Sequence, residues 1–302
     1  MSWILFAIIS YFLNAVTAII DKFLLNKSVP SPKAYAFYVG LLSIFAVVFL
    51  PFGVVWPGLL SVIKDLIPGI IFFWLVFFFV TAVKKNEVSR VVTMIGGFAP
   101  IFTLGLSFFI FHERLRNLHF AAFGLLVLGG VLISLKRSGV GEIKNRLAPS
   151  GISISVLTAF FFALYYVSAK FIFSDDQTFI STFFWSRMGS FLAALAILLI
   201  PSWRVKIFGA RKTAGTRGGA LFLTNKVVAA LAFILLNYSI KLGDAALVNA
   251  IQGVQYAFLF CLVLFFDKKY PNILEEKMTR SIIAQKILAI IIIGIGLSLL
   301  YF

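Results

Sequence analysis

Ten long apolar stretches, separated by short polar breaks, make up most of the chain. A helix that crosses the hydrocarbon core of a bilayer needs about 20 predominantly apolar residues, and each stretch approaches that length. We therefore predict an all-α polytopic membrane protein. Its ten transmembrane helices are expected at residues 3–24, 34–55, 66–83, 88–111, 117–135, 150–173, 178–200, 219–240, 245–266 and 281–301.

The composition agrees with this pattern, because 61% of the 302 residues are hydrophobic and only 13% are charged. The net charge of +16 would suit a nucleic-acid-binding protein, but the Lys and Arg residues fall almost entirely in the polar breaks. Basic residues that flank membrane helices explain this placement better, so we expect no nucleic-acid partner. A single cysteine, Cys261, leaves no disulfide framework. The opening stretch lacks the basic segment of a secretory signal and is kept as the first helix.

The second half of the sequence repeats features of the first. "DKFLL" (21–25) aligns with "AKFIF" (169–173), and "AVKKNE" (82–87) aligns with "SIKLGD" (239–244). The matched lysine, acidic and glycine positions keep one order along both halves, which chance alignment of apolar helices explains less well.

Each half holds five predicted helices, an odd number, so the second half must enter the membrane from the opposite side. We predict two inverted five-helix repeats, residues 1–137 and 150–302, joined by a linker at 138–149. Inverted repeats of this kind place a binding site near the bilayer midplane and expose it alternately to the two sides.

The basic residues are divided unequally between the two sides of the predicted bundle. Odd-numbered connectors hold 19 Lys and Arg residues, and even-numbered connectors hold five. Because Lys and Arg accumulate on the cytoplasmic side, this bias predicts that both termini lie outside.

Two motifs carry a family resemblance. "GGFAP" (96–100) lies in the fourth predicted helix, and "FHERLRNLHF" (111–120) follows it. With ten helices in two inverted halves, the chain resembles the ten-helix EamA-like branch of the drug/metabolite transporter superfamily. The most specific part of the resemblance is a proline in mid-helix, here Pro100. It lies about a dozen residues before a helix end with the sequence His112, Glu113, Arg114 and Leu115.

The resemblance implies a small-molecule carrier in a prokaryotic plasma (inner) membrane, with both termini cytoplasmic, against the charge count. The second half departs from the family pattern. Ala257 stands where Pro100 would map, and "DKKYP" (267–271) replaces the Glu-Arg pair.

The fourth predicted helix carries three residues that weaken a helix. Gly96, Gly97 and Pro100 lie within five positions, and Pro100 frees a carbonyl group one turn earlier. Such irregularity is tolerated in a membrane only where protein or a water-filled cavity covers it. We expect this helix to line the transport path; close packing of helices on the glycines is the alternative.

Polar amides mark the ninth predicted helix. Asn249, Gln252 and Tyr256 are spaced three and four residues apart and so share one helical face. We favour contact with the substrate over hydrogen bonds between helices, which contribute about 0.6–2 kcal/mol each.

Arg187 and Lys226 are the two cations that we expect within the membrane. Asp21, Glu87, Glu113, Asp244 and Asp267 all lie at helix ends, so we expect no carboxylate in mid-span to pair with them or to carry protons. The cations would then meet a substrate anion or extend to the interface. We favour the interface for Lys226 and function for Arg187.

Further polar and aromatic side chains complete the predicted cavity, and Trp3, Trp56 and Trp203 at helix ends are expected to be interfacial anchors. The candidate substrate-binding set is Asn14, Trp74, Thr93, Gly96, Pro100, Tyr165, Trp185, Arg187, Asn237, Asn249, Gln252 and Tyr256.

An enzyme would need a nucleophile, metal ligands or paired carboxylates around one cavity, and the sequence supplies none of these. His112 and His119 have only Glu113 nearby, so a capped turn is favoured over a metal site. We expect no catalytic residues, metal or cofactor. The predicted function is a secondary transporter, a facilitator or exchanger, for a small organic metabolite such as an amino acid or a related amphipathic or anionic compound.

The alternatives are a lipid-headgroup translocator, suggested by the basic connector 203–219, and a membrane scaffold subunit that does not transport. Membrane lipids are the other expected partners. We expect a monomer, with a homodimer as the alternative.

Overall fold

The structure is a computed structural model, and it describes residues 2–27, 31–85, 88–112, 116–134, 149–174, 178–210, 216–267 and 280–300. Within these ranges the regular elements are all helices. Nine of the described helical segments are long and apolar enough to cross a membrane, and Asn117–Ile133 is a shorter apolar helix. The chain is therefore a polytopic membrane protein by its structure as well as by its sequence.

The helices follow the predicted apolar stretches closely. Their bounds are α1 Ser2–Lys27, α2 Pro32–Leu42 with the 3₁₀ segment Ser43–Phe52, α3 Leu59–Lys85, α4 Val88–Phe111, α5 Asn117–Ser134, α6 Pro149–Phe173, α7 Phe179–Ala196 with the 3₁₀ turn Ile197–Leu199, α8 Pro201–Ala210, α9 Thr216–Leu242, α10 Ala245–Ala250, α11 Gly253–Asp267 and α12 Arg280–Leu299.

Three boundaries differ from the expectation. Helix α3 begins at Leu59, so Lys64 and Asp65 lie inside a helix that the sequence placed after them. A short helix, α8, occupies part of the basic connector. The ninth stretch is broken into α10 and α11. Most of the predicted linker, 138–148, lies outside the described residues, as do 113–115 and 268–271 of the family motifs.

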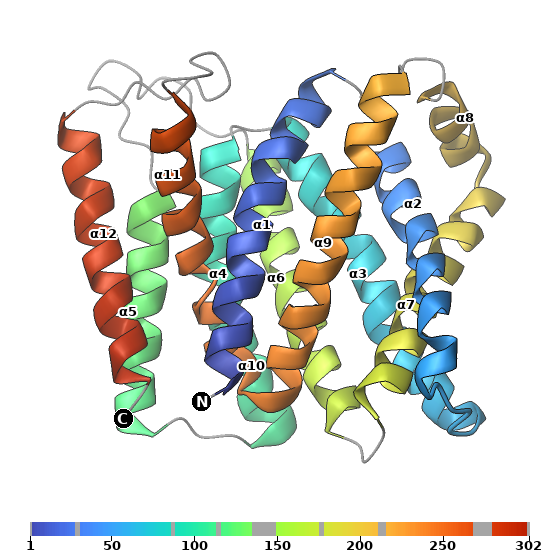
Figure 1. Cartoon of the computed structure of the whole chain (residues 1–302), viewed down its shortest axis with the longest axis horizontal. Coiled ribbons are helices and arrows are strands. Elements are labelled where there is room, and N and C mark those ends of the chain that lie inside the picture. The colour runs from blue at the N-terminus through green and yellow to red at the C-terminus, as the bar shows by residue number, and fades with distance from the viewer. Residues whose placement is uncertain are drawn as a thin grey trace.

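The helices stand side by side and alternate in direction, and α1 begins at the end of the bundle where α12 finishes (Figure 1). Helix α1 packs along α9, α6 along α3 and α4, and α5 along α12. The largest buried cluster is built from α1, α5, α6, α7, α9, α10, α11 and α12. Helix α6 is thus covered from both halves of the chain, and the side chains that it buries meet residues from each.

Helices α3 and α7 touch through their backbones. A Cβ atom on Gly69 would overlap the Ser186 carbonyl oxygen, and one on Gly189 would overlap the Leu66 carbonyl oxygen. The Ser190 hydroxyl donates a hydrogen bond of 2.7 Å to the Gly69 carbonyl oxygen. Small residues that bring backbones together are a usual basis of helix association in lipid, where apolar surface gives no driving force.

This contact yields a test of stability. We expect Gly69→Ala to lower the melting temperature in detergent, because a methyl group inserted against backbone forces the helices apart at a cost of about 1–3 kcal/mol. The control is Gly105→Ala on α4, where a Cβ atom meets nothing within 4 Å. The control should melt at the wild-type temperature or above it, since alanine favours a helix. Equal melting temperatures for the two variants would contradict the close contact.

Candidate functional site

The centre of the candidate site is the break between α10 and α11. Asp244 begins α10 as its N-cap, accepting hydrogen bonds of 2.8 and 3.3 Å from the Ala246 and Leu247 amides. At the break, the Gln252 amide donates to the Asn249 carbonyl at 3.0 Å, and the Val254 amide donates to the Ile251 carbonyl at 2.8 Å. These donors reach back three residues rather than four, so the Val248 carbonyl oxygen lacks the donor that an α-helix would give it.

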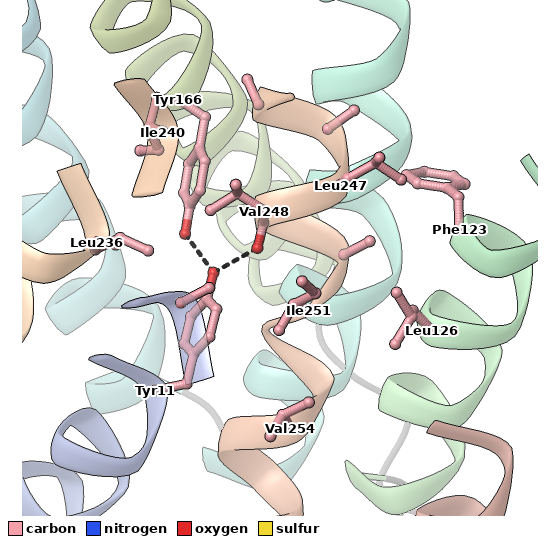
Figure 2. Packing of buried hydrophobic residues seen from close by; sticks show 14 of the residues in the cluster. Tyr11, Phe123, Leu126, Tyr166, Leu236, Ile240, Leu247, Val248, Ile251 and Val254 are labelled. Atoms are coloured by element: carbon pink, nitrogen blue, oxygen red, sulfur yellow. Dashed lines mark hydrogen bonds between the residues drawn. The ribbon is translucent and has the colours of Figure 1, made fainter. Parts of the chain in front are cut away.

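A tyrosine from the first helix supplies the missing donor. The Tyr11 hydroxyl donates to the Val248 carbonyl oxygen at 2.8 Å, and the Tyr166 hydroxyl lies 2.8 Å from the same Tyr11 oxygen (Figure 2). Because the Tyr11 proton is used on Val248, Tyr166 is the donor of the second bond. Both rings are almost fully buried. The hydrogen bonds tie α1, α6 and α10 together at the break.

The amides of the broken helix face α4. The Asn249 side-chain nitrogen donates to the Thr103 hydroxyl at 2.6 Å, and that hydroxyl donates to the Ala99 carbonyl at 2.8 Å. The Oδ1 atom of Asn249 and the Oε1 atom of Gln252 are buried without a hydrogen-bond partner among the described residues. Two buried acceptors at the break therefore have no donor among the described residues.

Glycine brings α11 against the same part of α4. A Cβ atom on Gly96 would lie 3.2 Å from the Tyr256 ring, and one on Gly97 would lie 3.1 Å from Val131 on α5. The sequence left open whether these glycines line a path or pack helices, and both contacts are packing contacts. Pro100 is buried, but α4 runs continuously through it. The structure shows no break at Pro100; the break lies in the ninth span, between α10 and α11.

A buried cation lies beside this region. The Arg187 guanidinium on α7 is 4.6 Å from the centre of the Phe72 ring, 4.3 Å from that of Phe233 and 5.8 Å from that of Phe183. The residue is only 7% exposed. Its Nε and Nη2 atoms have no hydrogen-bond partner in the described part of the chain.

Helix α6 connects the cation to the broken helix. The Tyr165 hydroxyl donates to Asn237 Oδ1 at 2.7 Å, and the Asn237 amide nitrogen donates to the Phe233 carbonyl at 2.8 Å. The Tyr165 ring lies 5.6 Å from Phe233 and 6.0 Å from Tyr166. Adjacent tyrosines on one helix thus face the cation and the broken helix respectively.

Eight of the twelve predicted site residues belong to these two neighbouring groups: Gly96, Pro100, Tyr165, Arg187, Asn237, Asn249, Gln252 and Tyr256. Of the others, Trp74 packs on Trp203 in a separate cluster beside α8. The Trp185 indole donates at 3.2 Å to the Val55 carbonyl in the α2–α3 connection. Asn14 bonds to Ser10 within α1 at 3.4 Å. The side chain of Thr93 lies outside the described residues.

Three expectations about charged and aromatic residues are corrected. Lys226 has a carboxylate partner that the sequence reading did not give it, because its ammonium group lies 2.9 Å from Asp21 and 2.8 Å from the Tyr35 hydroxyl. Asp65 is a carboxylate that the sequence reading missed; it is buried within α3. Trp203 is buried rather than anchored at an interface.

Sequence reasoning also missed Thr103 and Phe72. Thr103 follows Gly96 and Pro100 at spacings of seven and three, so the helical face alone would have found it. Phe72 had no distinguishing signal among 36 phenylalanines. Among the described residues, no three His, Cys, Asp or Glu side chains gather where they could hold a metal ion.

Comparison with solved structures shows the same fold elsewhere. A structure described only as the crystal structure of a protein matches over 99% of this chain and 98% of its own, with 18% identity and a TM-score of 0.68. In all, 26 chains of solved structures match. No family model and no curated protein matches the chain.

The tyrosine on the broken helix gives a second test of stability. We expect Tyr11→Phe to lower the melting temperature, because the Val248 carbonyl then loses its donor inside the membrane, at a cost of about 1–3 kcal/mol. Tyr238→Phe is the matched control, since Tyr238 makes ring contacts with Phe6 and Phe179. The control should melt within about 0.5 kcal/mol of wild type. A Tyr11→Phe protein as stable as the control would show that the break does not need this hydroxyl.

Proposed function

We propose that the chain is a secondary transporter, a facilitator or exchanger, that moves a small organic metabolite across a membrane by alternating access. The observation that carries this proposal is the break between α10 and α11, with the buried, unpartnered oxygens of Asn249 and Gln252 beside it. Discontinuous membrane helices of this kind form the substrate and ion sites of many carriers.

The pairing of helices supports the proposal of two inverted five-helix repeats. If α1 to α5 correspond in order to α6, α7, α9, α10–α11 and α12, then the contact of α1 with α9 corresponds to that of α6 with α3. Both contacts are extensive, and α5 packs on its own counterpart α12. The same order also agrees with the resemblance to EamA-like transporters.

The contact of α3 with α7 is closer than the corresponding contact of α9 with α2. Helices α3 and α7 touch through backbone at Gly69 and Gly189. The corresponding helices α9 and α2 meet through side chains, with Tyr35 2.8 Å from Lys226 and its ring 6.2 Å from that of Phe222. Tyr35 lies in the N-terminal part of α2, whereas Gly189 lies farther along the corresponding helix α7. In this proposal, rocking of the halves tightens one contact while it loosens the other.

The alternatives have weaker support. A lipid-headgroup translocator was suggested by the basic connector, and α8 places Arg204 and Lys206 at one end of the bundle. Basic residues there also serve as ordinary topology determinants. A scaffold subunit gives no reason to bury Arg187 and two free amide oxygens, each of which costs stability.

Transport in liposomes tests the proposal. Purified protein is reconstituted, and uptake is measured for a panel of labelled amino acids, organic acids and neutral amphipathic solutes. We expect uptake of at least one solute. We expect Asn249→Leu to lower that uptake by about tenfold, because the substitution removes the Asn249 amide and its hydrogen bond to Thr103 from the site. Thr224→Ala, a surface position bonded within its own helix, should transport like wild type.

Movement of labelled lipid without solute uptake would favour the translocator. Absence of both would favour a scaffold. Either result would overturn the carrier.

The unequal contacts give a further prediction. In a Cys261→Ala background, Tyr35→Cys and Phe222→Cys together place one thiol on α2 and one on α9, on the two sides of the present ring contact. A direct disulfide would need Cα atoms within about 7 Å, so the two thiols are joined by a reducible bifunctional thiol reagent. We expect the cross-link to reduce uptake about tenfold, because it holds α2 against α9 and prevents rocking. Reduction of the cross-link should restore uptake in the same sample, and each single-cysteine variant should keep its uptake when treated with the reagent. Unchanged uptake after complete cross-linking would contradict the rocking of these helices.

A further inference from the structure

We propose that Arg187 binds the carboxylate group of a monoanionic substrate, edge-on, through its Nε and Nη2 atoms. The inference rests on the proposed function and specifies the chemical class of its substrate.

The two unpartnered nitrogens are the pair that such an anion requires. In an arginine, the N–H of Nε and the outward N–H of Nη2 point in the same direction along one edge of the planar guanidinium. Two parallel N–H groups match the two oxygens of a carboxylate, and the pair of charge-assisted bonds is stronger than neutral hydrogen bonds. These two atoms of Arg187 are buried and bonded to nothing in the described structure.

Aromatic rings leave the edge as the direction of approach. Phe72 and Phe233 lie 4.6 and 4.3 Å from the guanidinium carbon, measured to the ring centres, and Phe183 lies at 5.8 Å. Stacked rings can satisfy the face of a guanidinium, but they provide no acceptor for its N–H groups. They also form an apolar wall for whatever part of the ligand follows its carboxylate.

The protein supplies no counterion within the described ranges. Asp21 is held by Lys226 at 2.9 Å, and neither Asp21 nor Asp65 forms an ion pair with Arg187. Tyr165 and Asn237, which contact Phe233 as Arg187 does, bond to each other. A cation kept in a membrane interior without an anion is destabilising, and its usual justification is function.

The charge of the site favours a carboxylate over a phosphate. One guanidinium balances one negative charge, whereas a phosphate monoester carries nearly two at neutral pH. In a desolvated region the second charge would have no partner among the described side chains, which is costly. The site is thus suited to a small acid with an apolar or aromatic body.

Equilibrium binding to the purified protein in detergent tests the proposal without transport. The probes are benzoate, phenylacetate and 3-phenylpropionate, each with its neutral amide, and phenyl phosphate. We expect at least one acid to bind about tenfold or more tightly than its amide and than phenyl phosphate. Arg187→Gln should abolish that preference, and Arg187→Lys should weaken it strongly because a point charge lacks the two parallel donors.

A second measurement needs no ligand. If Arg187 has no anionic partner until a ligand binds, Arg187→Met removes an unpaired buried charge and should raise the melting temperature of the ligand-free protein. Lys226→Met is the control, because it removes the partner of Asp21 and should lower the melting temperature. If Arg187 serves only to hold the surrounding rings together, Arg187→Met lowers it as well.

The outcomes separate this inference from the proposed function. Equal binding of acids and amides, no binding of any acid, or a preference that survives in Arg187→Gln would overturn the carboxylate site. Each of these results is compatible with uptake of other solutes in liposomes. Absence of all solute uptake would overturn the carrier even if the carboxylate preference were found.

Discussion

The architecture depends on one constraint: inside a bilayer, a peptide carbonyl that lacks a protein donor cannot form a hydrogen bond with water instead. Most of the described spans meet this constraint mainly with their own helical hydrogen bonds. The span formed by α10 and α11 does not, and the Tyr11 hydroxyl compensates at Val248. Because Tyr11 is in turn bonded to Tyr166, the broken helix is held by one helix from each half of the chain.

The polar groups around the break fall into two chemically distinct sets. On the side of α4, the free groups are acceptors, the amide oxygens of Asn249 and Gln252. On the side of α7, they are donors, the two nitrogens of Arg187. Tyr165 and Tyr166 stand between the sets, and their hydroxyl groups are already used. Unpartnered acceptors and unpartnered donors thus lie near two adjacent residues of α6.

The sequence predicted the positions of the helices well, because the length of an apolar stretch is a property of the chain alone. It predicted the break poorly. Pro100 suggested an irregular fourth helix, but α4 is assigned as one helix with the proline inside it. The break lies in the ninth span, and its compensation by Tyr11, 237 residues away in the chain, is encoded by no local pattern. Asp21 and Lys226 likewise stand 205 residues apart, so their pairing depended on tertiary structure. The contacts of Trp74 with Trp203 and of Trp185 with Val55 were also not predicted, since hydrophobic helices give little indication of which face meets protein and which meets lipid.

The burial of Arg187 has an electrical consequence. A fixed positive charge about 12 Å along α7 from Phe179 lies within the membrane field, which acts on a unit charge with about 2.3 kcal/mol per 100 mV when the whole field is crossed. Any displacement of α7 along the membrane normal therefore carries gating charge. If the chain is the carrier proposed above, a bound monoanion cancels that charge, so voltage biases the reorientation of the empty protein and has little effect on that of the occupied one.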